Sequence, residues 1–351
     1  MLEADPSVDL PSAGASGGGL SGAAPVPLGT GLPGGLAALR ELGRRQRVLI
    51  TIVGSLATAA VLALVLAQRR DEFSAALSGP AAWVLGVTAL LQIVALVARS
   101  EAWHVSIQAA GGTVARRVLY RASSMQVLGS VINGNLGVAA RITALRRSSP
   151  AVTPQVPTLI AAEFPILTVE AVLAALASFT LIGPLGLPWW APLIGIAVIG
   201  LASAGLRHLA VRTGRELWRG LAVVRSLSGG SRLVGFVLVA VAAQIARNWM
   251  LLHAVGVHAS VFDAIAVLIA VVTLGQLPVG PGVGAAAAVL ILGSDGVAAA
   301  AAAGVLMTVT GTVGGLVFAT WAGADHLLSG RRLRRARAGR SRKRSAGAPR
   351  R

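Results

Sequence analysis

Few side chains in this chain of 351 residues could do chemistry, because its long apolar stretches hold very few ionisable groups. Glu163 and Glu170 lie seven residues apart, about two helical turns, so they would share one face of a helix. Gln244, Arg247 and Asn248 form a polar stripe on a second apolar stretch. A charge within a membrane span costs about 2.5–3.5 kcal/mol on insertion scales, so these groups should face a protein interior or a cavity. Glu163 could pair with Arg247, or Arg247 could bind a lipid phosphate; ion pairs that only join helices are the alternative.

A weakly apolar segment over 122–141 contributes three more candidates. Asn133 and Asn135 could line a substrate path or cap the ends of a broken helix. Arg141 would lie at the cytoplasmic interface, where it could contact an anionic headgroup or act only as a topology determinant. Glu101, Trp103 and His104 follow the apolar run over 80–98, and for these three residues we favour the role of an interfacial anchor.

The composition is that of a membrane protein. Hydrophobic residues make up 55% of the chain, charged residues only 13%, and the mean hydropathy is +0.75, whereas soluble domains are about a quarter charged. The chain has no cysteine, which excludes disulfides, thiol nucleophiles and cysteine-ligated metals. Its five histidines have no ligand-like spacing, and no phosphate-binding loop contains a lysine. We therefore expect no metal, no cofactor and no enzymatic activity.

The elements that must position these residues are membrane helices. Apolar runs predict about six full spans, over 48–68, 80–98, 157–182, 188–206, 233–254 and 297–322. Segments 122–141 and 262–294 instead predict re-entrant broken helices, because glycine and proline interrupt the helical hydrogen bonds. The break residues are Gly134 and Gly137 in the first segment, and Pro278, Gly280, Pro281, Gly282 and Gly284 in the second.

Similar glycine spacing in the two segments predicts an inverted repeat with halves over about 80–182 and 233–322. The fold class is then an all-α polytopic membrane protein. The predicted domains are a disordered tail over 1–38, a transmembrane domain over 39–328 and a basic tail over 329–351.

The basic residues give the predicted topology. Of the 31 lysines and arginines, 28 fall on one side of the six-span arrangement, which predicts a plasma-membrane protein with both termini cytoplasmic. The net charge of +18 then mainly reflects membrane topology, since the basic residues gather on the cytoplasmic side, so we expect no nucleic-acid partner. The expected partners are membrane lipids, with anionic inner-leaflet phospholipid at the basic tail.

Short motifs resemble a known family. The family is that of the flippase-like membrane proteins related to the transmembrane region of lysylphosphatidylglycerol synthases. The chain resembles it in three features: the turn Asn133–Gly134–Asn135–Leu136–Gly137 ending in Arg141, then Glu163, and then the break over 277–284. The resemblance implies a lipid-handling membrane domain, which in relatives moves an aminoacylated phospholipid between leaflets. The chain departs from the family at two places. Phe164 follows Glu163, where the family has a Glu-Arg pair, and Ala286–Ala287 stands where the family has an Arg-Glu pair.

The sequence thus predicts a lipid-translocating or lipid-binding protein with a central polar groove for a headgroup. A non-catalytic scaffold or accessory subunit is the first alternative. An intramembrane transferase acting on a lipid carrier is the second, and the small number of carboxylates in the spans argues against it.

Overall fold

A computed structural model describes Ala60 and residues 67–130, 134–148, 153, 155–212, 223, 227–274, 283–293 and 296–346. The chain divides into two units, Met1–Val48 and Leu49–Arg351, and all described residues belong to the second. Several predicted features lie outside these residues: the tail over 1–38, nearly all of the span over 48–68, Asn133, Pro278, Gly280, Pro281 and Gly282.

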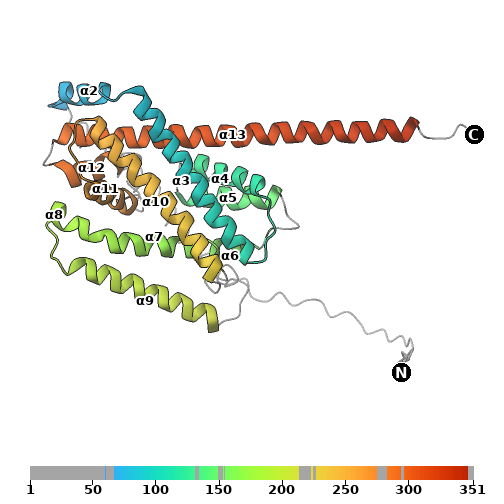
Figure 1. The fold of residues 1–351 in the computed structure, drawn as a ribbon, viewed down its shortest axis with the longest axis horizontal. Helices are drawn as coiled ribbons and strands as arrows, with labels where there is room; N and C mark the ends of the chain where they lie inside the picture. Colours follow the sequence, from blue (N-terminus) through green and yellow to red (C-terminus); the bar gives the residue numbers. More distant parts are fainter. Residues whose placement is uncertain are drawn as a thin grey trace, which may run out of the picture. The chain divides into compact units, whose positions relative to one another are not determined.

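Every regular element in the described part of the chain is helical (Figure 1). In chain order they are α2 (Arg70–Ser78), α3 (Ala82–Ala109), α4 (Arg116–Ser130), α5 (Gly134–Ser148), α6 (Val156–Ala161), α7 (Phe164–Ala177), the 3₁₀ turn η1 (Ser178–Leu181), α8 (Ile182–Leu185), α9 (Ala191–Arg212), α10 (Leu227–Ala254), α11 (Val261–Leu274), α12 (Val283–Leu292) and α13 (Val297–Ala346).

Four helical stretches are long and apolar enough to cross a membrane: Ala82–Ala109, Val156–Leu185, Ser228–Ala254 and Val297–Asp325. They agree with the predicted α-helical membrane protein. Of the other two predicted spans, 48–68 lies almost entirely outside the described residues, and 188–206 corresponds to α9. The apolar part of α9, Ala191–Gly205, is shorter than these four. Since about 20 apolar residues are needed to cross the hydrocarbon core, α9 does not count as a candidate span.

Helices α3 and α10 pack against each other and run antiparallel (Figure 1). Gly79, just before α3, lies near the Ala254 carbonyl at the end of α10. Further along α3, Gln92 contacts Arg247, which precedes Ala254. Alanines fill the interface, where Ala95, Ala98, Ala240 and Ala243 form a buried cluster. Small side chains let helix backbones approach closely, which is how membrane helices gain contact energy.

Helix α13 is the most enclosed of the four candidate spans. More than half (56%) of its most apolar window is buried, against 11–22% in the other three. Residues 300–303 are four consecutive alanines with no exposed surface. Successive helical residues point about 100° apart, so protein surrounds this turn on every side.

Glycines bring the backbone of α13 against its neighbours. A Cβ at Gly304 would lie less than 3.0 Å from backbone atoms of Gly284 and Ala285 in α12. A Cβ at Gly314 would lie 2.8 Å from the Ala89 carbonyl oxygen of α3. Helix α13 therefore joins α12, α3 and α4, all of which pack on it.

The first predicted broken segment is a helical hairpin formed by α4 and α5. Helix α4 ends at Ser130 and α5 begins at Gly134, and residues 131–133 lie outside the described part of the chain. The prediction that Gly137 is a break residue is wrong, because Gly137 lies inside α5 and packs on α4. A Cβ at Gly129 would lie 2.9 Å from the Gly137 Cα, so the missing side chains allow close packing of the hairpin.

The second broken segment contains α11 and α12, which also pack together. The prediction that Gly284 is a break residue is wrong for the same reason as for Gly137. Gly284 is the second residue of α12, and a Cβ there would lie 2.9 Å from the Gly304 carbonyl oxygen. At the start of α11, Ser260 and Asp263 form a reciprocal cap: the Ser260 amide donates to Asp263 Oδ2 over 2.8 Å, and the Asp263 amide donates to Ser260 Oγ over 3.2 Å.

The span predicted over 157–182 is interrupted at Glu163. Helix α6 ends at Ala161, α7 begins at Phe164, and the Glu163 amide donates to the Ile160 carbonyl over 3.1 Å, a tighter turn than in an α-helix. Pro165 follows and has no N–H to donate. The apolar stretch thus contains a helix break, with a carboxylate at the break.

Candidate functional site

The last turns of α3 carry a group of polar side chains that contact several other elements. The sequence predicts an interfacial anchor at Glu101, Trp103 and His104, but α3 continues to Ala109 and all three are buried. Helix α3 has no proline and only Gly86 in its interior, and it ends before Gly111, whose φ of +88° favours glycine. A hydropathy window shows where an apolar run ends, whereas the helix continues to the next breaking residue.

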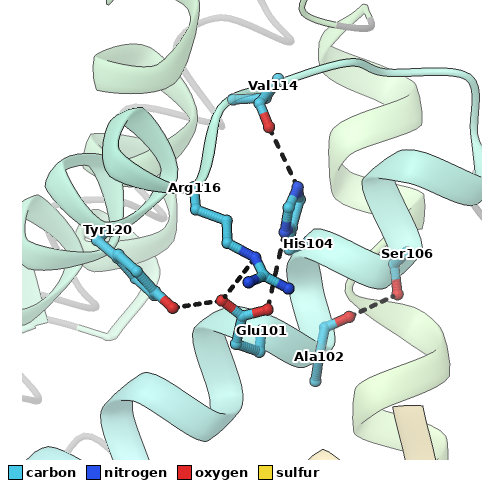
Figure 2. Close-up of polar contacts among 7 residues, drawn as sticks. All are labelled: Glu101, Ala102, His104, Ser106, Val114, Arg116 and Tyr120. Atoms are coloured by element: carbon cyan, nitrogen blue, oxygen red, sulfur yellow. Dashed lines mark hydrogen bonds and ion pairs between the residues drawn. The ribbon is translucent and has the colours of Figure 1, made fainter. Parts of the chain in front are cut away.

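Glu101 is the centre of one cluster, shown in Figure 2. The Tyr120 hydroxyl of α4 donates a short hydrogen bond to Glu101 Oε1. The Arg116 guanidinium lies 3.4 Å from the same oxygen, and His104 Nδ1 lies 3.8 Å from the other carboxylate oxygen. His104 Nε2 is 3.1 Å from the Val114 carbonyl oxygen, so this nitrogen is the donor. The cluster fastens α3 to α4 and to the loop between them.

Tyr120 keeps its proton in this cluster. Burial, the hydrogen bond to Glu101 and the Glu101 charge together raise the pKa of Tyr120 to about 12, although the Arg116 charge lowers it. The phenol is therefore a donor throughout the physiological pH range, with Glu101 Oε1 as its acceptor.

A second cluster joins α3, α5 and the break at Glu163. The Arg141 guanidinium forms an ion pair with the Glu163 carboxylate, and its central carbon lies 3.8 Å from the centre of the Trp103 ring. Arg141 is 1% exposed and Trp103 is fully buried. Stacking on an indole ring stabilises a desolvated guanidinium. The hairpin turns the Arg141 side chain inward, so it is not exposed to a headgroup in this structure. Its place at the cytoplasmic interface stays a prediction.

Glu170 has its own partner two turns along α7. Its carboxylate lies 2.9 Å from the Arg99 guanidinium of α3. Around the end of α3, the pairs Arg99–Glu170, Arg116–Glu101 and Arg141–Glu163 therefore balance three positive charges with three negative ones. This balance favours joining helices over binding another charged group.

Arg247 lies apart from these pairs. The suggested Glu163–Arg247 pairing is wrong, because Glu163 pairs with Arg141 while Arg247 donates a short hydrogen bond to Gln92 of α3. The Arg247 Nη2 also lies 3.4 Å from the Asn248 amide oxygen, and its Nε is buried without a hydrogen-bond partner. Among the residues that the structure describes, no carboxylate pairs with this cation.

The other predicted path residues have mixed outcomes. Asn248 is 1% exposed and lies beside Arg247, and Gln244 is partly buried one turn earlier in α10. Asn135 lies in the first turn of α5 and is described only by its backbone. Gly311 of α13 faces Arg247, because a Cβ there would lie 3.2 Å from Arg247 Nη1.

Sequence reasoning missed Gln92 and Tyr120. Gln92 is the one strongly polar side chain between residues 80 and 98, and Tyr120 is the only tyrosine of the chain. An isolated amide in an apolar run was therefore an available signal for Gln92, because a buried amide requires a hydrogen-bond partner.

No protein-family model matches this chain, and neither a search of curated proteins nor a search of solved structures finds a significant match.

Proposed function

We propose that this protein binds a membrane lipid with an anionic headgroup and moves it between leaflets, with Arg247 as the headgroup contact. The supporting observation is a guanidinium on a candidate span whose described neighbours are neutral amides. Without a counter-charge, the insertion cost of about 2.5–3.5 kcal/mol is not offset by an ion pair. A phosphate could accept hydrogen bonds from the Arg247 N–H groups that do not bind Gln92 or Asn248, including the buried Nε.

The proposal includes an inverted repeat. The order α3, hairpin α4–α5, broken span α6–α7 is followed by the order α10, pair α11–α12, span α13. The first members of each half, α3 and α10, run antiparallel and pack on each other, and opposite orientation of corresponding helices is what an inverted repeat predicts. Arg247 lies in this α3–α10 contact, where substrate sites of inverted-repeat transporters are found.

We further propose a plasma-membrane location with both termini cytoplasmic and anionic inner-leaflet lipid at the basic tail. The asymmetric arginine distribution supports this topology. The resemblance to flippase-like proteins supports the same function class, and the departure at Ala287 is explained by packing. Ala287 has no exposed surface and belongs to the core around α12 and α13, where a charged side chain would lack space.

The experiment is leaflet exchange of headgroup-labelled phosphatidylglycerol in liposomes that contain the purified protein. Arg247→Gln should reduce the exchange rate at least tenfold, because the amide cannot offset a phosphate charge, whereas Arg247→Lys should retain part of it. The matched control is Arg69→Gln, which removes an exposed arginine that lies 3.5 Å from Glu72. Exchange no faster than in protein-free liposomes, for anionic and zwitterionic lipids alike, would exclude the proposal.

The scaffold alternative is supported by the charge-balanced pairs at the end of α3, which join helices without leaving a free charge. On this alternative, Arg247→Gln would leave the cellular phenotype unchanged as long as the protein folds.

A further inference from the structure

We propose that Glu163 is a proton-binding site, and that its protonation releases the α4–α5 hairpin from the broken span α6–α7. This inference does not depend on lipid transport. It starts from the position of Glu163, a carboxylate with 8% exposure at the break of a candidate membrane span. Carboxylates within membrane spans are rare, and in pumps and transporters they form part of proton relays.

The ion pair is the charged link between the hairpin and the broken span. Arg141 lies on α5, and Glu163 lies between α6 and α7. Protonation converts the carboxylate to a neutral acid, so one proton is taken up and the attraction to the guanidinium is lost. Arg141 would then be a buried cation without a counter-charge, and among described residues its Nε already lacks a hydrogen-bond partner. The Trp103 ring alone compensates a desolvated guanidinium poorly.

The hairpin can respond as one body. Helices α4 and α5 are in backbone contact at Gly129 and Gly137, where a Cβ at Gly137 would lie 2.7 Å from the Gln126 carbonyl oxygen. A displacement of Arg141 toward water therefore carries α4 with it. On its other side, α4 packs on α13, where Val127 fills the space beside Gly315. Separation of the hairpin should open this α4–α13 contact.

Other ionisable groups must be considered as the source of any pH response. On its own helix, Glu163 is followed by Glu170, which pairs with Arg99 of α3. The remaining described groups on α5, or on the elements that pack on α6–α7 or on α5, are Glu101 and His104 of α3, Arg116, Arg117, Tyr120 and Arg121 of α4, Arg146 and Arg147 of α5, His208 of α9, Arg232, Arg247 and His253 of α10 and Asp263 of α11. Among the described carboxylates, Glu163 is the one that pairs with Arg141 of α5.

The reporter is a cysteine at Ser123 in a chain that has no native cysteine. Ser123 is 5% exposed, its hydroxyl has no hydrogen-bond partner, and it lies one turn before Val127 on the face toward α13. Ser123→Cys is nearly isosteric. Maleimide labelling in nanodiscs is measured from about pH 8 to about pH 4, a range that includes the ordinary pKa of a glutamate, and is divided by the rate for Ser148→Cys, an exposed position at the end of the same hairpin. The ratio removes the pH dependence of the thiol itself.

The expected result is a labelling ratio that rises at least tenfold on acidification, which corresponds to about 1.4 kcal/mol. Glu163→Gln, which imitates the protonated acid, should raise the ratio at every pH and remove its pH dependence. The matched control is Glu170→Gln, in the same candidate span and also paired with an arginine, which should keep the pH dependence. A low, pH-independent ratio in the otherwise native protein, or an unchanged titration in Glu163→Gln, would overturn the proposal.

If Glu163→Gln does not fold, Glu163→Asp gives the second test. It keeps the charge but shortens the side chain, so the pair with Arg141 weakens and the opening should occur at higher pH. An unchanged midpoint would refute the assignment to Glu163. All of these measurements remain valid if the protein moves no lipid, so the two proposals can fail separately.

Discussion

The contact between α12 and α13 can be tested by a single methyl group at Gly304. A Cβ at Gly304 would lie less than 3.0 Å from the Ala285 Cα, the Ala285 nitrogen and the Gly284 carbonyl oxygen. Ordinary carbon contacts begin at 3.4 Å, so Gly304→Ala must push the helices apart by at least about 0.4 Å. All three neighbours are backbone atoms, which cannot move by changing a rotamer.

The magnitude follows from two opposing effects. Overpacking of a close-packed site costs about 1–3 kcal/mol, and rigid backbone neighbours place Gly304→Ala at the upper end. Alanine is favoured over glycine in a helix interior by about 1 kcal/mol. Gly323→Ala is the control, because Gly323 lies on the same helix and has nothing within 4 Å of its Cβ position. The helix preference cancels between the two variants, so the difference in unfolding free energy should be about 3 kcal/mol.

The assay is reversible unfolding of both variants in mixed micelles, followed by helical circular dichroism as denaturing detergent is added. Gly304→Ala should unfold at a lower detergent fraction than the native protein, and Gly323→Ala at an equal or higher one. If Gly304→Ala is as stable as Gly323→Ala, the two helices are not in backbone contact, and the central position of α13 is refuted.

Two further predictions concern the end of α3. Tyr120 is the only tyrosine, so absorbance near 295 nm should report its ionisation alone, with a midpoint at about pH 12 that falls in Glu101→Gln. The folded state holds this proton more tightly than the unfolded chain, whose pKa is about 10, so the stability contributed by the group should be complete below that pH and decrease as the pH rises toward 12. Trp103→Ala should reduce the unfolding free energy by about 3–5 kcal/mol, whereas Trp321→Ala should cost less, because Trp321 is 52% exposed; equal losses in the denaturation assay would contradict the burial of Trp103.

The membrane class and the hairpin could be predicted from sequence because both depend on local patterns. Apolar runs locate the four candidate spans, and the polar turn after Ser130 predicts a break between α4 and α5. The roles of the glycines could not be separated in this way. A glycine that ends a helix and one that admits a neighbouring backbone look the same in sequence, and Gly137 is of the second kind.

The charged partners were also beyond sequence reasoning. Glu163 and Arg247 are the two ionisable residues that most need compensation, so their pairing is the simplest hypothesis. The actual partner, Arg141, is 22 residues before Glu163 and reaches it only because the hairpin returns its helix to the end of α3. Partner choice thus depends on tertiary packing, which periodicity does not encode.

The enclosure of α13 has a consequence for biosynthesis. Helix α13, which is surrounded by protein at residues 300–303, is the last of the described helices to leave the ribosome. Helices α3, α4 and α12 are therefore made before the element on which they pack. Alanine and glycine contribute little to membrane partitioning compared with leucine or isoleucine, so the small residues that suit α13 to its central place also weaken its insertion signal. Its integration should depend on helices already in the bilayer, and truncation before α13 should leave an assembly open to chaperones and proteases.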